Sequence, residues 1–485
     1  MQYHSTRSKE NQADSAQAVL AGLAPDGGLY VPAKLPQIDV DACLAEDTKA
    51  QAKRIISAML PDIPDMDILV DRAYTGKFQT EELTPTVDTG TFTVLELFRG
   101  PTSAFKDVAL CMLPQLLTAA KTVKGMDEDI LILTATSGDT GKAALAGFAD
   151  VEGVRICVFY PDGGVSKVQR AQMVTQEGKN VAVCAVEGNF DDAQTGVKNI
   201  FAAAVNGRLP GGNGYRLSTA NSINIGRLAP QITYYFKAYA DLLRRGRITM
   251  GQQVNFSVPT GNFGDILAGY LAKMLGLPVG KLICASNANN VLTDFINSGT
   301  YDRRRQLHKT ISPSMDILVS SNLERLLYFL SEDTDLVAEL MGQLNKQGFY
   351  TVPQALKDAI NEQFWAGCCD DEGARKTIAS VWEKEGYLCD THTATAWAVA
   401  GQYVEKTGDT RPMVVLSTAS PYKFPAAVLS SLEETAETDE FKQMELLQQK
   451  TGVPIPGNLV GLQEKKELHT GVIPKDTMLS YVMSL

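Results

Sequence analysis

The sequence predicts an α/β protein built on doubly wound, largely parallel sheets, preceded by an N-terminal accessory domain. Two observations predict this class. From about residue 91 onward, short runs rich in β-branched residues alternate with apolar patterns of helical period. Three of the loops that follow these runs are rich in glycine and hydroxyl residues. Ligands of doubly wound sheets bind beyond the carboxyl ends of the strands, so we expect the functional site in these loops.

The first part of the chain, residues 1–90, alternates polar helical stretches with loops, and residues 50–60 carry alanine and isoleucine at helical spacing. No constellation of catalytic residue types occurs there, so we expect an accessory domain. We assign residues 91–435 to the catalytic core, with a smaller α/β subdomain at roughly 129–225. Residues 436–485 are expected to form a C-terminal extension that packs on the core.

The expected strands of the core are short and apolar. They are Thr91–Phe98, Ile130–Thr134, Val154–Tyr160, Val181–Val186, Val254–Val258, Leu282–Ser286 and Met413–Ser417. A helix is expected over residues 108–120, where apolar residues recur with helical period.

Composition and charge limit the classes of partner. The 485 residues, 44% of them hydrophobic, suffice for two or three domains with substantial cores. A formal charge of −11 argues against nucleic acid or an anionic membrane as partner. The eight cysteines show neither a zinc spacing nor a disulfide framework, so we expect no metal and a reducing compartment. The start resembles no signal peptide and no long apolar run occurs, so we expect a cytoplasmic protein.

Lys106 lies at the junction between the first expected strand and the helix that follows it. Gly100 and Pro101 supply a turn, and Phe105 is an apolar neighbour that hinders hydration of the ammonium. A desolvated lysine loses its proton more readily, and a neutral amine is what Schiff-base formation requires. From spacing alone, a solvated lysine in the first turn of a helix is the favoured interpretation.

The loop at residues 134–141 suits an anion. Gly138 lets the backbone approach closely, Ser137 and Thr140 offer hydroxyl donors, and the helix that follows presents free N–H groups. A P-loop is excluded because the glycines are too close together and Ala143 stands where serine or threonine is needed. An ordinary helix cap is an equally good interpretation of this loop.

Two later loops have the same composition. In residues 257–265, Gly261 and Gly264 bracket a turn whose N–H groups can cradle a phosphate, which we favour over a plain turn. In residues 416–424, a buried strand ends in hydroxyl residues that can meet a heterocycle nitrogen. On its own, this loop is weak evidence for a ligand site.

The segment at residues 218–227 brings amides, a hydroxyl and a guanidinium together. Arg227 can clamp a phosphate or a carboxylate through two parallel hydrogen bonds. An arginine paired with an acidic residue on a helix surface is the favoured interpretation if this segment stands alone.

Taken together, these motifs closely resemble the threonine synthase family, within the fold type II (tryptophan synthase β-like) class of pyridoxal-phosphate enzymes. The resemblance covers nearly the whole chain. It is carried by residues 3–7, 26–30, 100–107, 134–141, 221–227, 261–265, 312–316 and 418–424. It implies pyridoxal 5′-phosphate (PLP) as cofactor and O-phospho-L-homoserine as substrate. The implied reaction is a γ-elimination of phosphate followed by β-addition of water, which yields L-threonine.

The resemblance also implies residue roles. Lys106 holds the cofactor as a Schiff base and moves the protons of the reaction as general base and general acid. The remaining cofactor contacts are implied for Gly261, Asn262, Phe263, Gly264, Thr418 and Asp139. The substrate contacts are implied for Thr136, Ser137, Gly138 and Thr140 at its carboxylate, and for Asn221, Ser222, Asn224 and Arg227 at its phosphate.

The sequence departs from the family pattern at a few positions. Ser103 stands where bacterial relatives often have leucine, Thr391 precedes His392 where proline is usual, and Ser420 replaces a histidine. We expect a monomer or a small homo-oligomer that acts on a small molecule.

Two other functions are open from the sequence. One is another fold type II lyase, such as a threonine dehydratase or an O-acylserine sulfhydrylase, and the other is a non-catalytic ligand sensor. The cluster from Asn221 to Arg227 argues against such a lyase, which needs no pocket for a second phosphate. Retention of Lys106 argues against the sensor.

Overall fold

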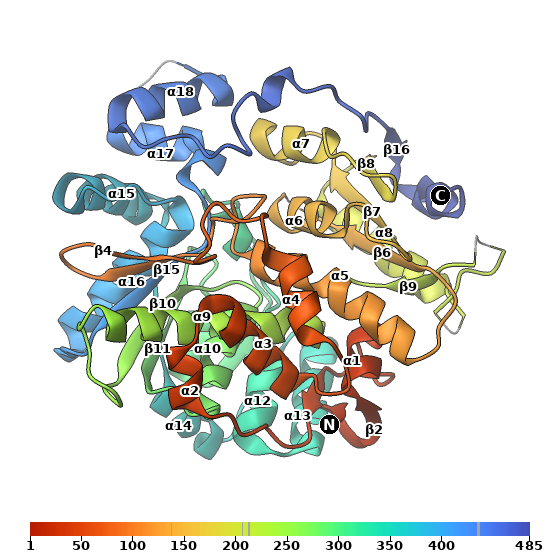
Figure 1. Cartoon of the computed structure of the whole chain (residues 1–485), viewed down its shortest axis with the longest axis horizontal. Helices are drawn as coiled ribbons and strands as arrows, with labels where there is room; N and C mark the ends of the chain where they lie inside the picture. Colours follow the sequence, from red (N-terminus) through yellow and green to blue (C-terminus); the bar gives the residue numbers. More distant parts are fainter. Residues whose placement is uncertain (137, 206, 212–213, 434–436) are drawn as a thin grey trace.

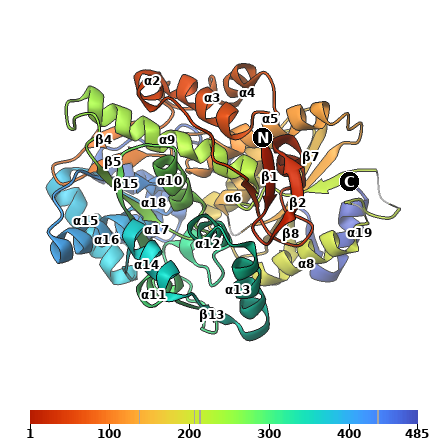
Figure 2. The same ribbon diagram turned by 90° about the horizontal axis from the view of Figure 1, so that it is seen from below.

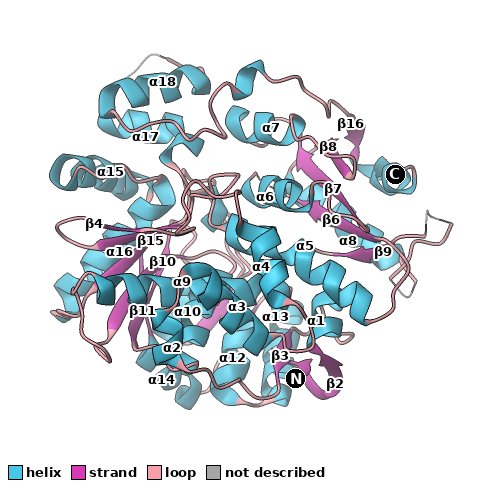
Figure 3. Cartoon of the chain, in the orientation of Figure 1, coloured by secondary structure: helices cyan, strands magenta, loops and turns pink. Residues whose placement is uncertain are grey.

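The computed structural model describes residues 1–136, 138–205, 207–211, 214–433 and 437–485, and it confirms the α/β class (Figure 1). Two largely parallel sheets lie side by side, and helices cover their faces (Figure 3). Among the described residues, no helix combines the length and the apolar character needed to cross a membrane.

The larger sheet has six strands in the order β14-β11-β10-β15-β5-β4. Its strands are β14 (Phe364–Cys368), β11 (Val279–Ser286), β10 (Val254–Pro259), β15 (Met413–Ser417), β5 (Thr93–Glu96) and β4 (Thr86–Asp88). Neighbouring strands are parallel, except that β4 runs antiparallel to β5 at the edge. Every residue of β10 and β15 is buried, as expected of parallel strands covered on both faces.

The smaller sheet has five parallel strands in the order β16-β8-β7-β6-β9. They are β16 (Val472–Pro474), β8 (Val181–Glu187), β7 (Val154–Pro161), β6 (Ile130–Ala135) and β9 (Arg216–Ser218). The helix α5 (Lys106–Val123) packs against α6 (Asp139–Phe148), which covers β7. On its other side α5 packs against α9 (Ile225–Arg244), so α5 lies between the two halves.

The N-terminal part contains a small antiparallel sheet that the sequence did not predict. It consists of β1 (Gln2–Ser5), β2 (Ser8–Asp14) and β3 (Tyr30–Pro32), and Figure 2 shows β1 and β2 near α12 (Leu323–Ser331). Strand β2 is polar except at Ala13, so its composition does not indicate a strand. The sheet is tied to α12 by an Arg7–Glu324 ion pair at 2.8 Å.

The remaining N-terminal helices pack on the core. They are α1 (Ser15–Ala21), α2 (Val40–Ala45), α3 (Thr48–Met59) and α4 (Met66–Tyr74). Their buried side chains, among them Ile55 and Ile56 of α3, belong to the same apolar cluster as those of α5 and α9. This part of the chain therefore shares its apolar core with the catalytic region, and the boundaries at 90 and 435 stay predictions.

Other helices complete the two halves. They are α7 (Lys167–Val174), α8 (Phe190–Ala203), α10 (Gly264–Met274), α11 (Val291–Ser298), α13 (Thr334–Gln347), α14 (Gln354–Gln363), α15 (Asp371–Glu385) and α16 (Thr391–Thr407). A second small antiparallel pair joins β12 (Thr300–Asp302) and β13 (Phe349–Thr351).

The C-terminal segment runs across both halves along the top of Figure 1. It leads from α17 (Pro425–Leu432) and α18 (Glu440–Thr451) to β16, the edge strand of the smaller sheet, and ends at α19 (Met478–Met483).

Candidate active site

Lys106 is the first residue of α5, and the turn before it is fixed by the neighbouring carboxylate. Asp107 accepts hydrogen bonds from the Thr102 N–H at 2.9 Å and the Thr102 hydroxyl at 2.5 Å. Gly100 must be glycine here, because a Cβ at this position would lie 2.4 Å from the Cβ of Asp107. The expected turn is thus present, although Thr102 bonds to Asp107 and does not cap the helix.

The Lys106 side chain is buried, so the solvated-lysine interpretation is wrong. Only 8% of the residue is exposed, and its Nζ lies 4.5 Å from the ring centroid of Phe105 and 3.5 Å from the Ser314 hydroxyl. Burial lowers the pKa of Lys106 from 10.5 to about 8, and the negative charge of Asp139 partly opposes that shift. A pKa of about 8 leaves roughly a tenth of the amine neutral at pH 7, far more than for an ordinary lysine.

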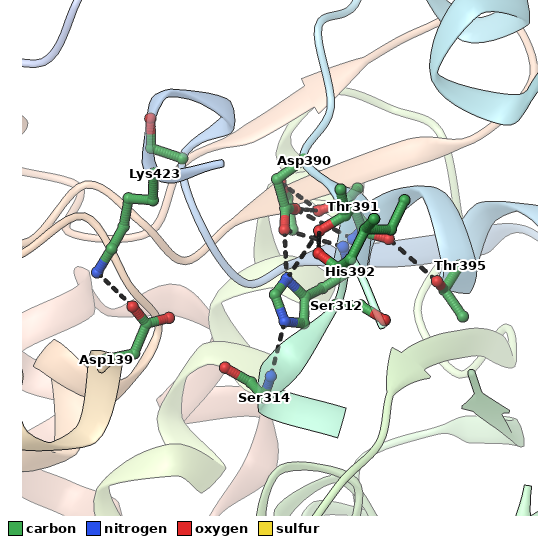
Figure 4. Close-up of polar contacts among 12 residues, drawn as sticks. Asp139, Ser312, Ser314, Asp390, Thr391, His392, Thr395 and Lys423 are labelled. Carbon is green, nitrogen blue, oxygen red and sulfur yellow. Dashed lines mark hydrogen bonds and ion pairs between the residues drawn. The ribbon is translucent and has the colours of Figure 1, made fainter. Parts of the chain in front are cut away.

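The segment that carries Ser314 is held by a buried histidine. The Ser314 N–H donates to Nε2 of His392 at 3.1 Å, and Nδ1 of His392 lies 2.7 Å from a carboxylate oxygen of Asp390 (Figure 4). Since a backbone N–H only donates, Nε2 carries no proton, and the Nδ1 proton is donated to Asp390. Asp390 also caps α16 through the Thr393 N–H. This geometry gives His392 a structural role at the start of α16.

The residues from Gly261 to Gly264 form the turn into α10 and leave their amides free. In the described part of the chain, none of their four N–H groups donates to a protein acceptor. Their carbonyls are engaged, because Gly261 O accepts from the Ser320 hydroxyl at 2.8 Å and Asn262 O accepts from Asn322 N at 3.0 Å. A loop fixed through its carbonyls, with free amides at a helix start, suits a phosphate.

Thr418 lies just beyond the carboxyl end of β15. Its carbonyl accepts from the Phe105 N–H at 2.8 Å, and the Ser420 N–H donates to Ser103 O at 3.1 Å. These bonds hold its loop against the turn before Lys106. Within the described ranges the buried Thr418 hydroxyl has no hydrogen-bond partner, so it is free to meet a ligand. Ser420 itself caps the short turn after it, by accepting from the Tyr422 N–H.

The loop before α6 is braced by Thr136 and ends at Asp139. The Thr136 hydroxyl accepts from the N–H groups of Gly138 and Gly141 at 3.0 and 2.9 Å, and Gly138 has a φ of 139°, which disfavours any other residue. The half-buried Thr140 follows in the first turn of α6. Ser137 lies outside the described residues.

Asp139 is buried and carries an ion pair that the sequence did not predict. Its Oδ1 lies 2.6 Å from Nζ of Lys423 and accepts from Nε2 of Gln169 at 3.0 Å (Figure 4). Despite burial, the two lysines Lys423 and Lys106 hold the pKa of Asp139 well below its usual range. Asp139 is thus a carboxylate in this site.

Arg227 is buried near the start of α9, so the surface ion-pair interpretation is wrong. It is 3% exposed, and burial lowers its pKa to about 10. One nitrogen, Nη1, donates to Ala220 O at 2.7 Å, but the buried Nε has no partner. Among the described residues no carboxylate pairs with this guanidinium. An unpaired buried cation of this kind suits a ligand anion.

The other predicted site residues of the segment 218–227 differ in whether their side chains already form hydrogen bonds within the protein. Asn221 is exposed and accepts from the Thr134 hydroxyl at 3.3 Å, whereas the half-buried Ser222 accepts only through its carbonyl, from Asn322. The fully buried Asn224 uses both ends of its amide, since Oδ1 accepts from the Gly226 N–H and Nδ2 donates to Val19 O, both at 2.9 Å. The structure therefore gives Asn224 the role of a helix cap, and its predicted contact with a ligand gains no support.

Sequence reasoning missed Lys423 and Ser314 as members of the site. Both lie in motifs that carried the resemblance, at residues 418–424 and 312–316, so a signal existed. The residues next to Ser314 and Lys423 in the sequence do not indicate that either side chain is buried near Lys106. The contacts of both side chains are with segments far away in the chain.

Three family profiles match the chain. "Threonine synthase N terminus" matches residues 2–74, "Pyridoxal-phosphate dependent enzyme" matches residues 75–419, and "Threonine synthase, C-terminal" matches residues 393–474.

Individual relatives agree with these profiles. Threonine synthase of Pseudomonas aeruginosa is 42% identical, over 88% of this chain and 90% of its own. Human threonine synthase-like 1 is 40% identical over 86% of this chain, which spans only 58% of the human protein's length. The crystal structure of PLP-bound threonine synthase from Brucella melitensis superposes with a TM-score of 0.89 at 38% identity, covering 100% of this chain and 99% of the other.

Proposed function

Because the chain belongs to the threonine synthase family of pyridoxal-phosphate-dependent enzymes, we propose that it converts O-phospho-L-homoserine and water to L-threonine and phosphate. One observation carries the choice of substrate. Arg227 is a buried guanidinium with an unpaired nitrogen, and the turn at Gly261–Gly264 offers free amides of its own. Two anion sites match a phosphorylated cofactor together with a phosphorylated substrate.

The site fits PLP on this chain's own contacts. The free amides from Gly261 to Gly264 would hold its phosphate, Thr418 would meet its ring nitrogen, and Lys106 would bond to it covalently. When bound, PLP supplies an electron sink for negative charge next to the α-carbon of the amino acid. A neutral threonine hydroxyl favours protonation of the ring nitrogen less than a carboxylate does. Thr418 would therefore make the bound cofactor a weaker electron sink.

Lys106 is the residue suited to move protons in this reaction. With a pKa of about 8 it exchanges a proton readily at neutral pH. It removes a proton from the α-carbon and then from the β-carbon, and it returns one at the γ-carbon after phosphate leaves. After water adds at the β-carbon, a proton returns to the α-carbon. Ser314, 3.5 Å away, limits where the amine lies between these transfers.

The substrate is held at both ends in this proposal. Its carboxylate meets the loop of Thr136, Ser137, Gly138 and Thr140, and its phosphate meets Asn221, Ser222 and Arg227. Asp139 lies beside the carboxylate loop and the cofactor. Arg227 contributes most as charge develops on the departing oxygen, because its desolvated guanidinium needs no reorganisation.

The test is turnover of O-phosphohomoserine by the purified protein supplied with PLP. We expect stoichiometric release of inorganic phosphate and of threonine, identified by mass spectrometry. Deamination of serine or threonine without phosphate release would favour the dehydratase-like alternative, and sulfide-dependent cysteine formation from an O-acylserine would favour the sulfhydrylase. Ligand binding without any turnover would favour the sensor.

A cytoplasmic location and a monomeric or small homo-oligomeric state are part of the same proposal. All eight cysteines are free thiols, which suits a reducing compartment.

A further inference from the structure

Lys423 is a buried cation that the proposed reaction does not use. It lies in the short helical turn Pro421–Lys423 after β15 and is 0% exposed. Its Nζ lies 2.6 Å from Oδ1 of Asp139 and donates to Thr102 O at 3.0 Å (Figure 4). Lys423 therefore joins the loop after β15, the start of α6 and the turn before Lys106.

Stability alone does not explain such a pair. Removing two charges from water costs most of the free energy that their attraction contributes. Apolar residues of similar size often give the folded protein equal stability. The pair is also one-sided, since Oδ1 of Asp139 takes both the Lys423 bond and the Gln169 bond. In Figure 4 the other carboxylate oxygen points away from Lys423.

Four elements place charged groups around the Lys106 amine. Asp139 comes from α6, Asp265 from α10, Arg227 from α9 and Lys423 from the loop after β15. The two carboxylates favour the charged ammonium, whereas the two cations and burial favour the neutral amine. Around Lys423 itself lie two further charged groups, Asp107 and Lys142.

We propose that Lys423 is a positioning residue, whose buried ammonium engages Asp139 and so keeps that carboxylate from capturing Lys106 as an ion pair. This inference rests on the proposed role of Lys106 as the reactive amine. Without Lys423, the Asp139 carboxylate would lack its ion-pair partner, and Lys106 is the other lysine whose charge acts on it. A lysine held in that way keeps its proton and no longer attacks a carbonyl group.

The test follows the pH dependence of PLP uptake by the apoprotein, monitored by the absorbance of the bound cofactor. Uptake requires the neutral amine, so its midpoint reports the proton affinity of Lys106. We expect Lys423→Met to move the midpoint upward by about one pH unit and to slow uptake about tenfold at pH 7. Asp139→Asn should move the midpoint downward. The double variant should return to within a few tenths of a unit of the wild type, and Lys423→Arg should rescue the profile.

A purely structural Lys423 gives a different pattern. The double variant lacks the bond to Thr102 just as Lys423→Met does, so a midpoint that stays displaced in the double variant would overturn the proposal. An unchanged midpoint in Lys423→Met would also overturn it. If Lys423→Met does not fold, an unchanged midpoint in Asp139→Asn decides against the proposal and a lowered midpoint decides for it.

The assigned reaction and the positioning role of Lys423 can be refuted independently of each other. Wild-type protein that takes up PLP but releases no phosphate from O-phosphohomoserine refutes only the assigned reaction. If the wild type takes up no PLP, the same midpoints are measured by competitive acetylation of Lys106 with acetic anhydride, read out by peptide mass. The pattern expected for the four variants is then unchanged.

Discussion

At the scale of single residues, the chain contains two buried arginines that differ in their partners. Burial lowers the pKa of both Arg227 and Arg325 to about 10. Arg325 donates from Nε to Tyr30 O at 3.0 Å and from its two other nitrogens to Asn322 and to Ile223 O, both at 2.6 Å. Within the described ranges, the Arg227 side chain has only its bond to Ala220 O. Burial therefore does not distinguish Arg227 from Arg325, whereas the unpaired Nε does.

Arg227→Lys keeps the charge but loses the planar fork. We expect this variant to fold and to bind PLP normally, yet to lose at least about tenfold in kcat/KM for O-phosphohomoserine, roughly 1.4 kcal/mol of transition-state stabilisation. Steady-state phosphate release measures the loss. Arg325→Lys is the matched control, and it should lower the melting temperature more than the activity of the folded fraction. Equal losses by Arg227→Lys on slow serine or threonine deamination would make Arg227 structural.

The buried Lys106 predicts a pH-dependent cost of folding in the apoprotein. Its folded pKa of about 8 lies below the unfolded value of 10.5, so the unfolded chain binds more protons between these values. Stability therefore rises with pH across this window, and the full cost is present below it. Lys106→Met should remove that cost.

We expect Lys106→Met to abolish turnover and to stabilise the apoprotein at pH 7 by about 3 kcal/mol at most, from the size of the shift. The advantage should vanish above pH 10.5. Urea unfolding of both apoproteins from pH 7 to 10.5 measures it. Lys406→Met, at an exposed position of α16, is the control and should show no such trend. A difference independent of pH would mean that folding does not lower the pKa of Lys106.

At the scale of elements, the strands that the sequence predicted are those buried on both faces. β6, β7, β8, β10 and β15 begin where their apolar runs begin, because parallel strands covered by helices leave no room for polar residues. The strand β2 was missed because its polar composition does not indicate a strand, and the short β16 was missed because it pairs with β8, far away in the chain. The site follows the same division. The sequence predicted Lys106, Gly261 and Thr418 because they lie in loops that follow strands. It did not predict Lys423, because the contacts of Lys423 join segments that are far apart in the chain.

The turn into α10 depends on a close approach of two backbones. A Cβ at Gly261 would lie 2.5 Å from the carbonyl oxygen of Ser314. Gly261→Val should therefore displace the segment that positions both the phosphate cradle and Ser314, and we expect at least about tenfold weaker PLP binding. Titration of apoprotein with PLP measures the affinity. Gly342→Val, on α13 with open space around its Cα, is the control. Unchanged PLP affinity in Gly261→Val would place the cradle elsewhere.

The start of α16 holds the Ser314 segment through His392. His392→Phe removes the acceptor for the Ser314 N–H and leaves the Asp390 carboxylate without one donor. We expect the Ser314 amide to exchange its hydrogen faster by about tenfold, with a loss of about 1–3 kcal/mol in global stability. Hydrogen exchange with mass analysis separates the local from the global effect. A uniform increase over the whole chain would show that His392 acts through stability alone.

At the scale of the whole molecule, the site lies where the two sheets meet. Lys106, Gly261 and Thr418 come from the half with the larger sheet, and Asp139 comes from the half with the smaller one. The C-terminal segment crosses both halves, because α18 packs near α17 and β16 pairs with β8 (Figure 1). Movement of one half relative to the other would therefore be resisted by this segment.

Asn458, in the same segment, touches the turn before Lys106. Its Nδ2 donates to Pro101 O at 2.8 Å, and its Oδ1 accepts from the Ser103 hydroxyl at 3.0 Å. Ser103 has a φ of 59°, so the turn is held in a conformation that a non-glycine residue seldom adopts. The two Asn458 bonds thus help to hold a strained turn. A leucine at residue 103 could not form the second bond.

Asn458→Ala should therefore loosen the turn from a distance of more than three hundred residues in the chain. We expect a loss of about 1–2 kcal/mol in stability and faster loss of PLP on dialysis, because each bond contributes about 0.5–1.5 kcal/mol net. Asn345→Ala, at an exposed position of α13, is the control. A double-mutant cycle with Ser103→Ala isolates the bond between the two side chains. Strictly additive effects of the two substitutions would show that the C-terminal segment covers the turn without holding it.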